Sequence, residues 1–138
     1  MAVPRSSERE SVARLRVRYA ETDKMGVVYY ANYLVWFEVA RCEWLRGTGS
    51  SYRDLEAGGT ILPVIEAHCE YRRPLRYDED VEVRARATLL SPVRLRFDYD
   101  VRPAGAAEAA AIGSTVHAAV DGGGRLRRLP ESVRSLFA

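Results

Sequence analysis

One aspartate, Asp23, lies in a short polar loop, ETDKMG, and a long aromatic run, VVYYANYLVWF, follows the loop at once. A loop carboxylate can act as a nucleophile or as a general base. The same residue type near the start of a helix often only caps backbone N–H groups. Gly26 closes the loop and can adopt backbone angles that other residues avoid. From these residues alone, both interpretations of Asp23 stay open.

A half-buried strand is expected immediately before this loop. From residue 12 onward, apolar and arginine side chains alternate, and alternation with period two is typical of a strand with one buried face. The apolar set is Ala13, Leu15, Val17 and Tyr19. Residues 1–11 do not continue the pattern, so we predict a flexible lead-in at 1–11 and a single domain over 12–138.

A long helix is expected immediately after the loop. Aromatic and small residues recur there at spacings of three and four, which predicts a helix with one broad buried face. These residues are Tyr33, Trp36, Phe37, Ala40 and Trp44. Asn32 suits the N-cap position of this helix, and Gly47 suits a C-terminal stop.

The remaining chain has the pattern of antiparallel strands separated by turns. Strands are expected within residues 61–74, 79–91, 94–102 and 107–121. In the first of these segments, the side chains expected to face inward are those of Ile65, Ala67, Cys69 and Tyr71. A glycine turn, a last short strand and a short helix complete the chain. One helix against one antiparallel sheet is an α+β fold, and the unpaired edge of such a sheet favours self-association.

The composition of the chain excludes several classes of protein. With 138 residues, 47% of them hydrophobic and 29% charged, the chain suits one globular domain. A net charge of +2 gives no reason to expect nucleic acid. No apolar run approaches the roughly 20 residues that cross a bilayer, and there is no apolar leader, so the default expectation is a cytoplasmic protein. Cys42 and Cys69 have no metal-binding spacing, so no metal site is expected.

The segment RYAETDKMGVVYYANYLVWFEVARCEWLRGTG, residues 18–49, resembles the signature of the hotdog-fold acyl-CoA thioesterases of the 4-hydroxybenzoyl-CoA thioesterase family. The shared pattern is a Tyr, three residues, an Asp, two or three residues, a Gly and an aromatic-Asn-Tyr helix start. Two later segments, YRRPLRYDEDVEV and GRLRRLPESV, also resemble pieces of that family. The likeness therefore covers about residues 12–135.

This resemblance implies a hotdog fold, in which a curved antiparallel sheet wraps around one long central helix. It implies that two chains pair into one continuous sheet, as a homodimer or homotetramer, with active sites at the dimer interface. The implied reaction is hydrolysis of an acyl-CoA, or a related thioester, to a free acid and a thiol. No cofactor is expected, because coenzyme A is part of the substrate.

The resemblance also implies roles for single residues. Asp23 matches the family's catalytic carboxylate, which attacks the carbonyl or activates a water. The backbone N–H of Tyr30 matches the donor that polarises the thioester carbonyl, which requires the helix to begin near Val28–Tyr30. Gly26 and Val27 are expected beside the substrate.

Two aromatic positions of the motif, Tyr30 and Tyr19, differ in how they compare with the family. Many relatives carry His where this chain has Tyr30, and that difference removes an acid–base imidazole but leaves the backbone role intact. Tyr19 matches a tyrosine that some relatives use near the site, although a core aromatic at the end of a strand is the simpler interpretation. His68 and His117 lie outside the motif, and we expect both to be structural.

The phosphates of coenzyme A require cations near the mouth of the site. The arginines considered for this role are Arg72, Arg73, Arg94 and Arg96, although such residues on a strand are often simply solvated. Two other functions stay open at this point. One is a hotdog hydratase or dehydratase, which usually needs an acid–base His; the other is a non-catalytic module that binds acyl-CoA or RNA.

Overall fold

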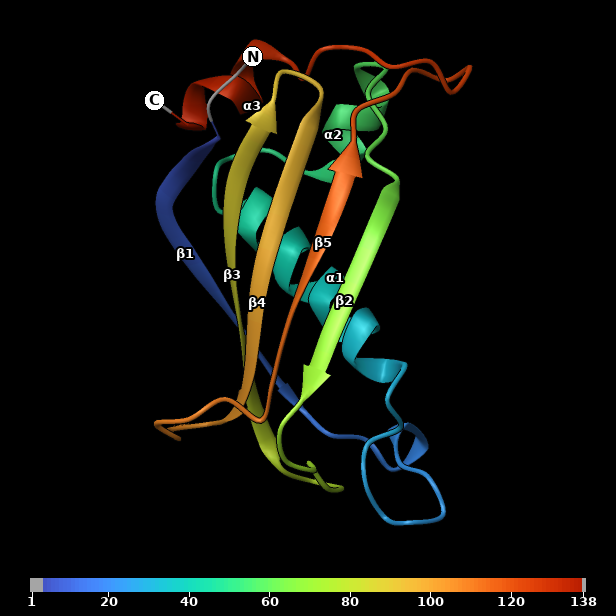
Figure 1. The fold of residues 1–138 in the computed structure, drawn as a ribbon, viewed down its shortest axis with the longest axis vertical. Coiled ribbons are helices and arrows are strands. Elements are labelled where there is room, and N and C mark those ends of the chain that lie inside the picture. The colour runs from blue at the N-terminus through green and yellow to red at the C-terminus, as the bar shows by residue number, and fades with distance from the viewer. Residues whose placement is uncertain (1–3, 138) are drawn as a thin grey trace.

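The structure is a computed structural model that describes residues 4–137. Figure 1 shows an antiparallel sheet with one long helix, α1, lying across one of its faces. The strands are β1 (Arg5–Arg16), β2 (Val64–Tyr71), β3 (Asp80–Ser91), β4 (Arg94–Pro103) and β5 (Ala111–Ala118). The helices are η1 (Tyr19–Glu21), α1 (Asn32–Arg46), α2 (Tyr52–Ala57), α3 (Glu131–Arg134) and η2 (Ser135–Phe137). In the sheet the strands follow the order β1-β3-β4-β5-β2.

The core lies between α1 and the sheet, as the spacing of aromatic residues predicts. Trp36, Phe37 and Trp44 are buried on the inner face of α1. The ring of Phe37 stacks on Tyr99 of β4 with centroids 4.3 Å apart. A Cβ at position 113 would lie 2.6 Å from the ring of Phe37, so only Gly113 lets α1 approach β5 this closely. The predicted α+β class is confirmed.

The expected lead-in at residues 1–11 is wrong from Arg5 onward, because β1 begins there. Residues 1–3 lie outside the described residues. Glu10 pairs with Arg86 of β3 across the ladder, and the carbonyl of Arg9 accepts a 3.1 Å hydrogen bond from the indole of Trp44. Strand pairing and contact with α1 therefore order a segment that has no apolar alternation of its own.

The orientation expected for β2 is confirmed, since Tyr71 packs on Tyr33 of α1 and His68 lies on the opposite face, but the expected burial is wrong. Ile65 and Tyr71 are 44% and 47% exposed, and of the four residues expected to face inward only Cys69 is partly buried. The strand is at the edge of the sheet with β5 as its single neighbour, so its apolar side chains lack a cover within one chain.

Two smaller elements differ from expectation. Helix α2 forms in a polar segment where no helix was predicted, and the hydroxyl of Ser51 caps it by accepting a 3.1 Å hydrogen bond from the Asp54 amide. The last predicted strand is reduced to one bridge between Val120 and Leu126. Within residues 4–137, no helix is long and apolar enough to cross a membrane.

Candidate active site

The loop that carries Asp23 is a tight hairpin. A bridge between Thr22 and Val28 closes its base. Inside the bridge, the Asp23 amide donates to the carbonyl of Val27 at 2.9 Å and the Gly26 amide donates to the carbonyl of Asp23 at 3.0 Å. Gly26 has φ of 78°, so a glycine is needed there for the turn, as the sequence predicts.

The carboxylate of Asp23 is only partly engaged by the backbone. Its Oδ1 atom accepts a 2.8 Å hydrogen bond from the Met25 amide. Its Oδ2 atom has no hydrogen-bond partner in the described part of the chain, and the side chain is partly exposed. The interpretation of Asp23 as a local cap therefore accounts for one of the two oxygens and leaves the other available.

Helix α1 begins at Asn32 with Ala31 in the N-cap position, so the expected start near Val28–Tyr30 is wrong. Asn32 is not the N-cap either. Its side-chain amide donates to the carbonyl of Glu21 at 2.8 Å, which fastens the start of the helix to η1. The backbone nevertheless turns ahead of the helix, since the Asn32 amide donates to the carbonyl of Tyr29 at 2.9 Å.

This turn leaves the Tyr30 amide without an acceptor among residues 4–137. In a trans peptide the N–H and C=O groups point in opposite directions. Because the carbonyl of Tyr29 points toward the Asn32 amide, the N–H of Tyr30 points away from the helix. The helix dipole adds partial positive charge at this end. The donor role expected of Tyr30 therefore needs no helix that starts earlier.

Asp23 and Tyr30 line the same cavity, of about 330 Å³. Of the predicted site residues, it brings together Asp23, Val27, Tyr30, Arg72 and Arg73. Its other lining residues are Met25, Val28, Tyr33, Tyr71 and Pro74. Backbone contacts explain this convergence, because the Val28 amide donates to the carbonyl of Leu75 at 2.9 Å and so places the segment after β2 beside the loop.

Glu21 is a supporting residue that the sequence analysis missed. Its carboxylate is buried and accepts hydrogen bonds from the Arg18 amide and from the indole of Trp36, each at 2.8 Å. Burial alone would raise the pKa of Glu21, but these hydrogen bonds and the Arg18 guanidinium outweigh burial and lower the pKa. Its carbonyl also accepts from the Tyr29 amide at 2.9 Å. Glu21 therefore holds the loop against α1.

Tyr19 and Gly26 do not line the cavity. Tyr19 is 77% exposed, so the expectation that it would share the buried face of the first strand is wrong. Its ring packs edge-on against Tyr77 with centroids 5.6 Å apart. Gly26 shapes the loop without facing the cavity.

Arg94 and Arg96 are separated from Asp23 within one chain. Tyr71, which lines the cavity, is in register with Ala111 and through it with Val101 of β4. Arg96 lies five residues from Val101, or about 17 Å along the strand at 3.3 to 3.4 Å per residue. Its guanidinium is also paired with Asp98 at 2.9 Å. The structure therefore places Arg72 and Arg73 at the candidate site, whereas Arg94 and Arg96 lie away from it.

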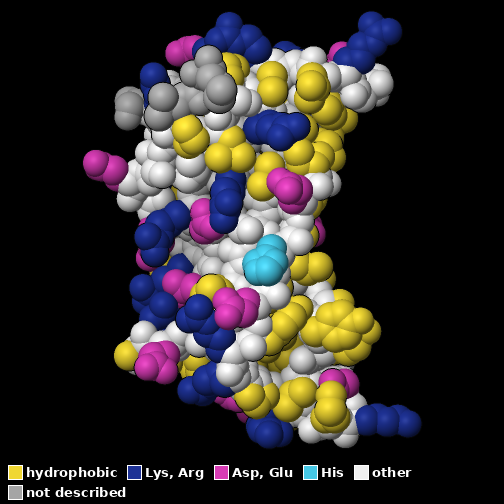
Figure 2. Space-filling view, in the orientation of Figure 1, with side chains coloured by type: hydrophobic (Ala, Val, Ile, Leu, Met, Phe, Trp, Pro, Cys, Tyr) yellow, Lys and Arg dark blue, Asp and Glu magenta, His cyan; other side chains and the backbone are white. Residues whose placement is uncertain are grey.

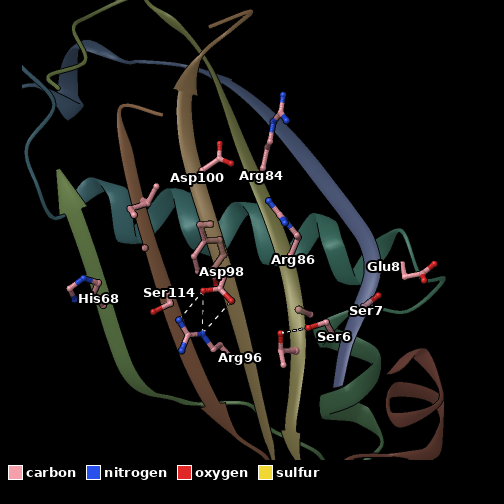
Figure 3. Close-up of a pocket in the computed structure, with 15 residues that line it drawn as sticks. Ser6, Ser7, Glu8, His68, Arg84, Arg86, Arg96, Asp98, Asp100 and Ser114 are labelled. Atoms are coloured by element: carbon pink, nitrogen blue, oxygen red, sulfur yellow. Dashed lines mark hydrogen bonds and ion pairs between the residues drawn. The ribbon is translucent and has the colours of Figure 1, made fainter. Parts of the chain in front are cut away.

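A larger cavity of about 640 Å³ lies on the opposite face of the sheet. Figure 3 shows its labelled side chains on the side of the strands away from α1. Its lining charges are balanced, since Arg84, Arg86 and Arg96 lie among Glu8, Asp98 and Asp100. Figure 2 shows the same mixture of basic and acidic side chains across this face. The outer cavity therefore has no excess charge to attract an anionic substrate.

The two histidines lie apart from Asp23. His68 lines the outer cavity. His117 is fully buried, with Nδ1 3.0 Å from the carbonyl of Leu62 and Nε2 2.9 Å from the hydroxyl of Thr115. Burial lowers the pKa of His117 to about 4, so its imidazole is neutral near pH 7. Residues 4–137 contain no cluster of three or more metal-ligating side chains.

The chain is similar to known proteins in both sequence and structure. Over 73 residues the chain is 47% identical to YneP of Bacillus subtilis (strain 168), and that match spans 53% of either chain. A crystal structure of a protein from Thermus thermophilus is 42% identical and has a TM-score of 0.85, with 92% of this chain and 96% of that chain covered.

A crystal structure of DHNA-CoA thioesterase from Staphylococcus aureus is 36% identical, with a TM-score of 0.82 over 87% of this chain and 80% of that chain. Residues 17–137 match the family described as the Thioesterase-like superfamily. The narrower assignment to the 4-hydroxybenzoyl-CoA thioesterase family stays a prediction. The matched segment includes the Asp23 loop, α1 and all strands after α1, and the chain belongs to the Thioesterase-like superfamily.

Proposed function

We propose that this protein hydrolyses acyl-CoA thioesters to a free acid and coenzyme A. One observation carries the proposal: a carboxylate oxygen of Asp23 and the amide of Tyr30, both without partners in residues 4–137, belong to residues that line one cavity. A thioester hydrolase needs these two groups, one to deliver an oxygen nucleophile and one to stabilise the carbonyl oxygen. Membership of the Thioesterase-like superfamily supports the same reaction.

In the general-base route, Asp23 takes a proton from a water whose oxygen attacks the thioester carbon. The carbonyl oxygen becomes negative and accepts a hydrogen bond from the Tyr30 amide, an interaction typically worth about 3 kcal/mol in the transition state. The C–S bond then breaks, and the proton held by Asp23 passes to the departing sulfur.

In the nucleophilic route, Asp23 attacks the carbon itself, the thiolate leaves, and water hydrolyses the resulting anhydride. Label found in the Asp23 carboxylate after many turnovers in ¹⁸O-water would establish the nucleophilic route, because in the general-base route that carboxylate forms no bond to the incoming oxygen.

The arm of coenzyme A is proposed to leave the site past Arg72 and Arg73. Both arginines also line a neighbouring cavity of about 670 Å³, to which Arg102 adds a third guanidinium beside Asp100 and Glu108. Arg72 lies 3.5 Å from Glu70, whereas Arg73 has no acidic partner within 4.0 Å among residues 4–137. Arginine suits phosphate because its guanidinium presents several donors in one plane.

The active form is proposed to be a homo-oligomer, dimer or tetramer, that completes the hotdog fold around α1. Strand β2 is an uncovered edge, and Figure 2 shows hydrophobic side chains gathered along it. Leu34, Val35 and Val39 of α1 are each at least 41% exposed. A second copy that pairs along β2 would cover both sets of apolar side chains. We further propose that the protein works in the cytoplasm without a cofactor.

The alternative functions are not favoured by the site. A hydratase or dehydratase needs an acid–base histidine near the carboxylate, but His68 lies on the outer face and His117 is buried against Thr115. An RNA-binding module needs a basic surface, whereas the arginines of the outer face are balanced by acids.

The test is a thiol-release assay of the purified protein with short, medium, long and aromatic acyl-CoAs. We expect release from at least one class and a large loss of that rate in Asp23→Asn, with an unchanged circular dichroism spectrum. Full activity in Asp23→Asn would disprove the mechanism. No release from any class would disprove the function.

A further inference from the structure

Tyr71 connects the edge strand to the start of α1. It is the last residue of β2, and its hydroxyl donates a 2.9 Å hydrogen bond to the carbonyl oxygen of Tyr30. Its ring packs edge-on against Tyr33 with centroids 5.0 Å apart. The sequence analysis expected Tyr71 to be only a core aromatic, and neither the motif nor the proposed mechanism uses its hydroxyl.

The hydrogen bond from the Tyr71 hydroxyl to the Tyr30 carbonyl replaces a backbone hydrogen bond that is weak in the first turn of the helix. The amide of Tyr33 is 3.4 Å from the carbonyl of Tyr30, which is longer than a normal N–H···O bond. The first turn is therefore weakly closed at this carbonyl, and Tyr71 supplies the closer donor. On the other side of Tyr30, the Asn32 amide holds the carbonyl of Tyr29 at 2.9 Å. The two peptide groups that flank Tyr30 are thus held at their carbonyl oxygens by separate donors.

We propose that Tyr71 is a positioning residue, whose hydroxyl fixes Tyr30 so that the Tyr30 amide points at the thioester oxygen. The inference rests on the proposed function, since it assigns the amide of that same site. It also gives β2 a role in the chemistry, because the strand that forms the uncovered edge of the sheet holds the donor in place. Preorganised donors stabilise a developing oxyanion because they need no rearrangement during the reaction.

The phenol has the properties that this role requires. Burial, followed by the nearby Cys69 thiol, raises the pKa of Tyr71. The hydroxyl therefore keeps its proton and stays a donor at neutral pH and across the mildly acidic and mildly basic range around it. Its contribution should be independent of pH over that range.

The experiment compares Tyr71→Phe with the wild-type protein and with Tyr77→Phe as a matched control. Phenylalanine keeps the ring packed on Tyr33 and removes only the hydroxyl. Tyr77 is also an exposed tyrosine, and its hydroxyl has no hydrogen-bond partner in the described residues. We expect kcat to fall about tenfold in Tyr71→Phe at unchanged KM, because the group acts on the transition state more than on binding. Tyr77→Phe should match the wild type.

A spectroscopic measurement separates positioning from general loosening of the fold. In the Asp23→Asn background, a ¹³C=O-labelled acyl-CoA can be held unreacted, and infrared difference spectra report how strongly its carbonyl is polarised. We expect a shift to lower frequency on binding, and a smaller shift when Tyr71→Phe is added. An equal shift in both proteins would overturn the inference, whatever the rates.

The kinetic outcomes also distinguish the two proposals. If the wild type hydrolyses acyl-CoA and Tyr71→Phe has the same kcat, the positioning role is wrong and the proposed function stands. If the wild type hydrolyses no acyl-CoA, the proposed function fails and the positioning role fails with it.

Discussion

The outer cavity and the cavity at the start of α1 differ in the pairing of the acidic and basic groups that line them. The outer face has the larger cavity, yet Arg96 is paired with Asp98, and Arg86 with Glu10 at 2.8 Å. The cavity at the start of α1 has about half the volume, but Asp23 and Tyr30 each have a polar group without a partner among residues 4–137. The unpaired groups, and not the cavity volumes, indicate the active site. Charged groups that are already paired with each other are less available to bind a substrate.

This comparison predicts that unpaired groups serve the reaction while paired groups serve stability. The largest expected effect is at Asp23. Asp23→Asn should lower kcat by about 10³-fold, as the loss of a catalytic nucleophile or base does, with little change in the free energy of unfolding. The matched variant on the outer face, Asp98→Asn, should leave kcat unchanged. Thiol-release kinetics and urea unfolding of both variants provide the test, and equal losses of kcat would remove the distinction between the faces.

The second prediction concerns His117, a buried group with both ring nitrogens paired. Its pKa is about 4 in the folded protein and about 6.5 when unfolded, so the unfolded state binds more protons between these values. Stability should therefore fall as pH drops from about 6.5 to 4, by roughly 3 kcal/mol at 1.4 kcal/mol per unit. Urea unfolding across this range should show a weaker pH dependence in His117→Asn. The exposed His68→Asn should keep the wild-type slope, and a weaker slope there would contradict the assignment.

The third prediction concerns Glu21, whose carboxylate is buried and paired. Glu21→Gln should destabilise the protein by about 1–3 kcal/mol, because a neutral amide replaces a charged acceptor for Trp36 and Arg18. Since the folded pKa is lowered, this stability is present above the ordinary glutamate pKa and is lost as pH falls through the lower folded value. Thermal unfolding at pH 7 and at pH 3 should show a smaller difference between the two proteins at pH 3. An equal difference at both would exclude a role for the charge.

The smallest expected effect concerns Arg73, the cavity arginine without an acidic partner. Arg73→Gln should raise KM for acyl-CoA about fivefold at low salt, a loss of about 1 kcal/mol, and less at high salt because exposed charges are screened. Arg96→Gln, which removes a paired arginine of the outer face, should leave KM unchanged. If KM in the Arg73 variant does not respond to salt, the arginine does not meet the phosphates.

Much of the fold follows from periodic patterns in the sequence. Helix α1 and the strands after it were predicted because apolar residues recur with helical or strand spacing. The start of β1 was missed because residues 5–11 are polar and are ordered by their partner strand. The exposure of β2 was missed because alternation indicates a strand without showing what covers it.

The site was predictable in part and for different reasons. Asp23 and Tyr30 belong to a long motif, and the arginines at 72 and 73 follow directly after β2. Glu21 gave no signal, because an acid in a polar loop is usually solvated. The partner of the Tyr71 hydroxyl is 41 residues away in the chain, and no local pattern reports such a contact.

The carbonyl of Glu21 accepts from both the Tyr29 amide and the side chain of Asn32, at 2.9 and 2.8 Å. One oxygen atom thereby anchors both the outgoing end of the hairpin and the first residue of α1. Changes of sequence or length at the hairpin tip could then move the carboxylate without disturbing the oxyanion donor. The position of the Asp23 carboxylate and the position of the Tyr30 amide can therefore change independently. This independence lets the same fold accommodate acyl groups of different width.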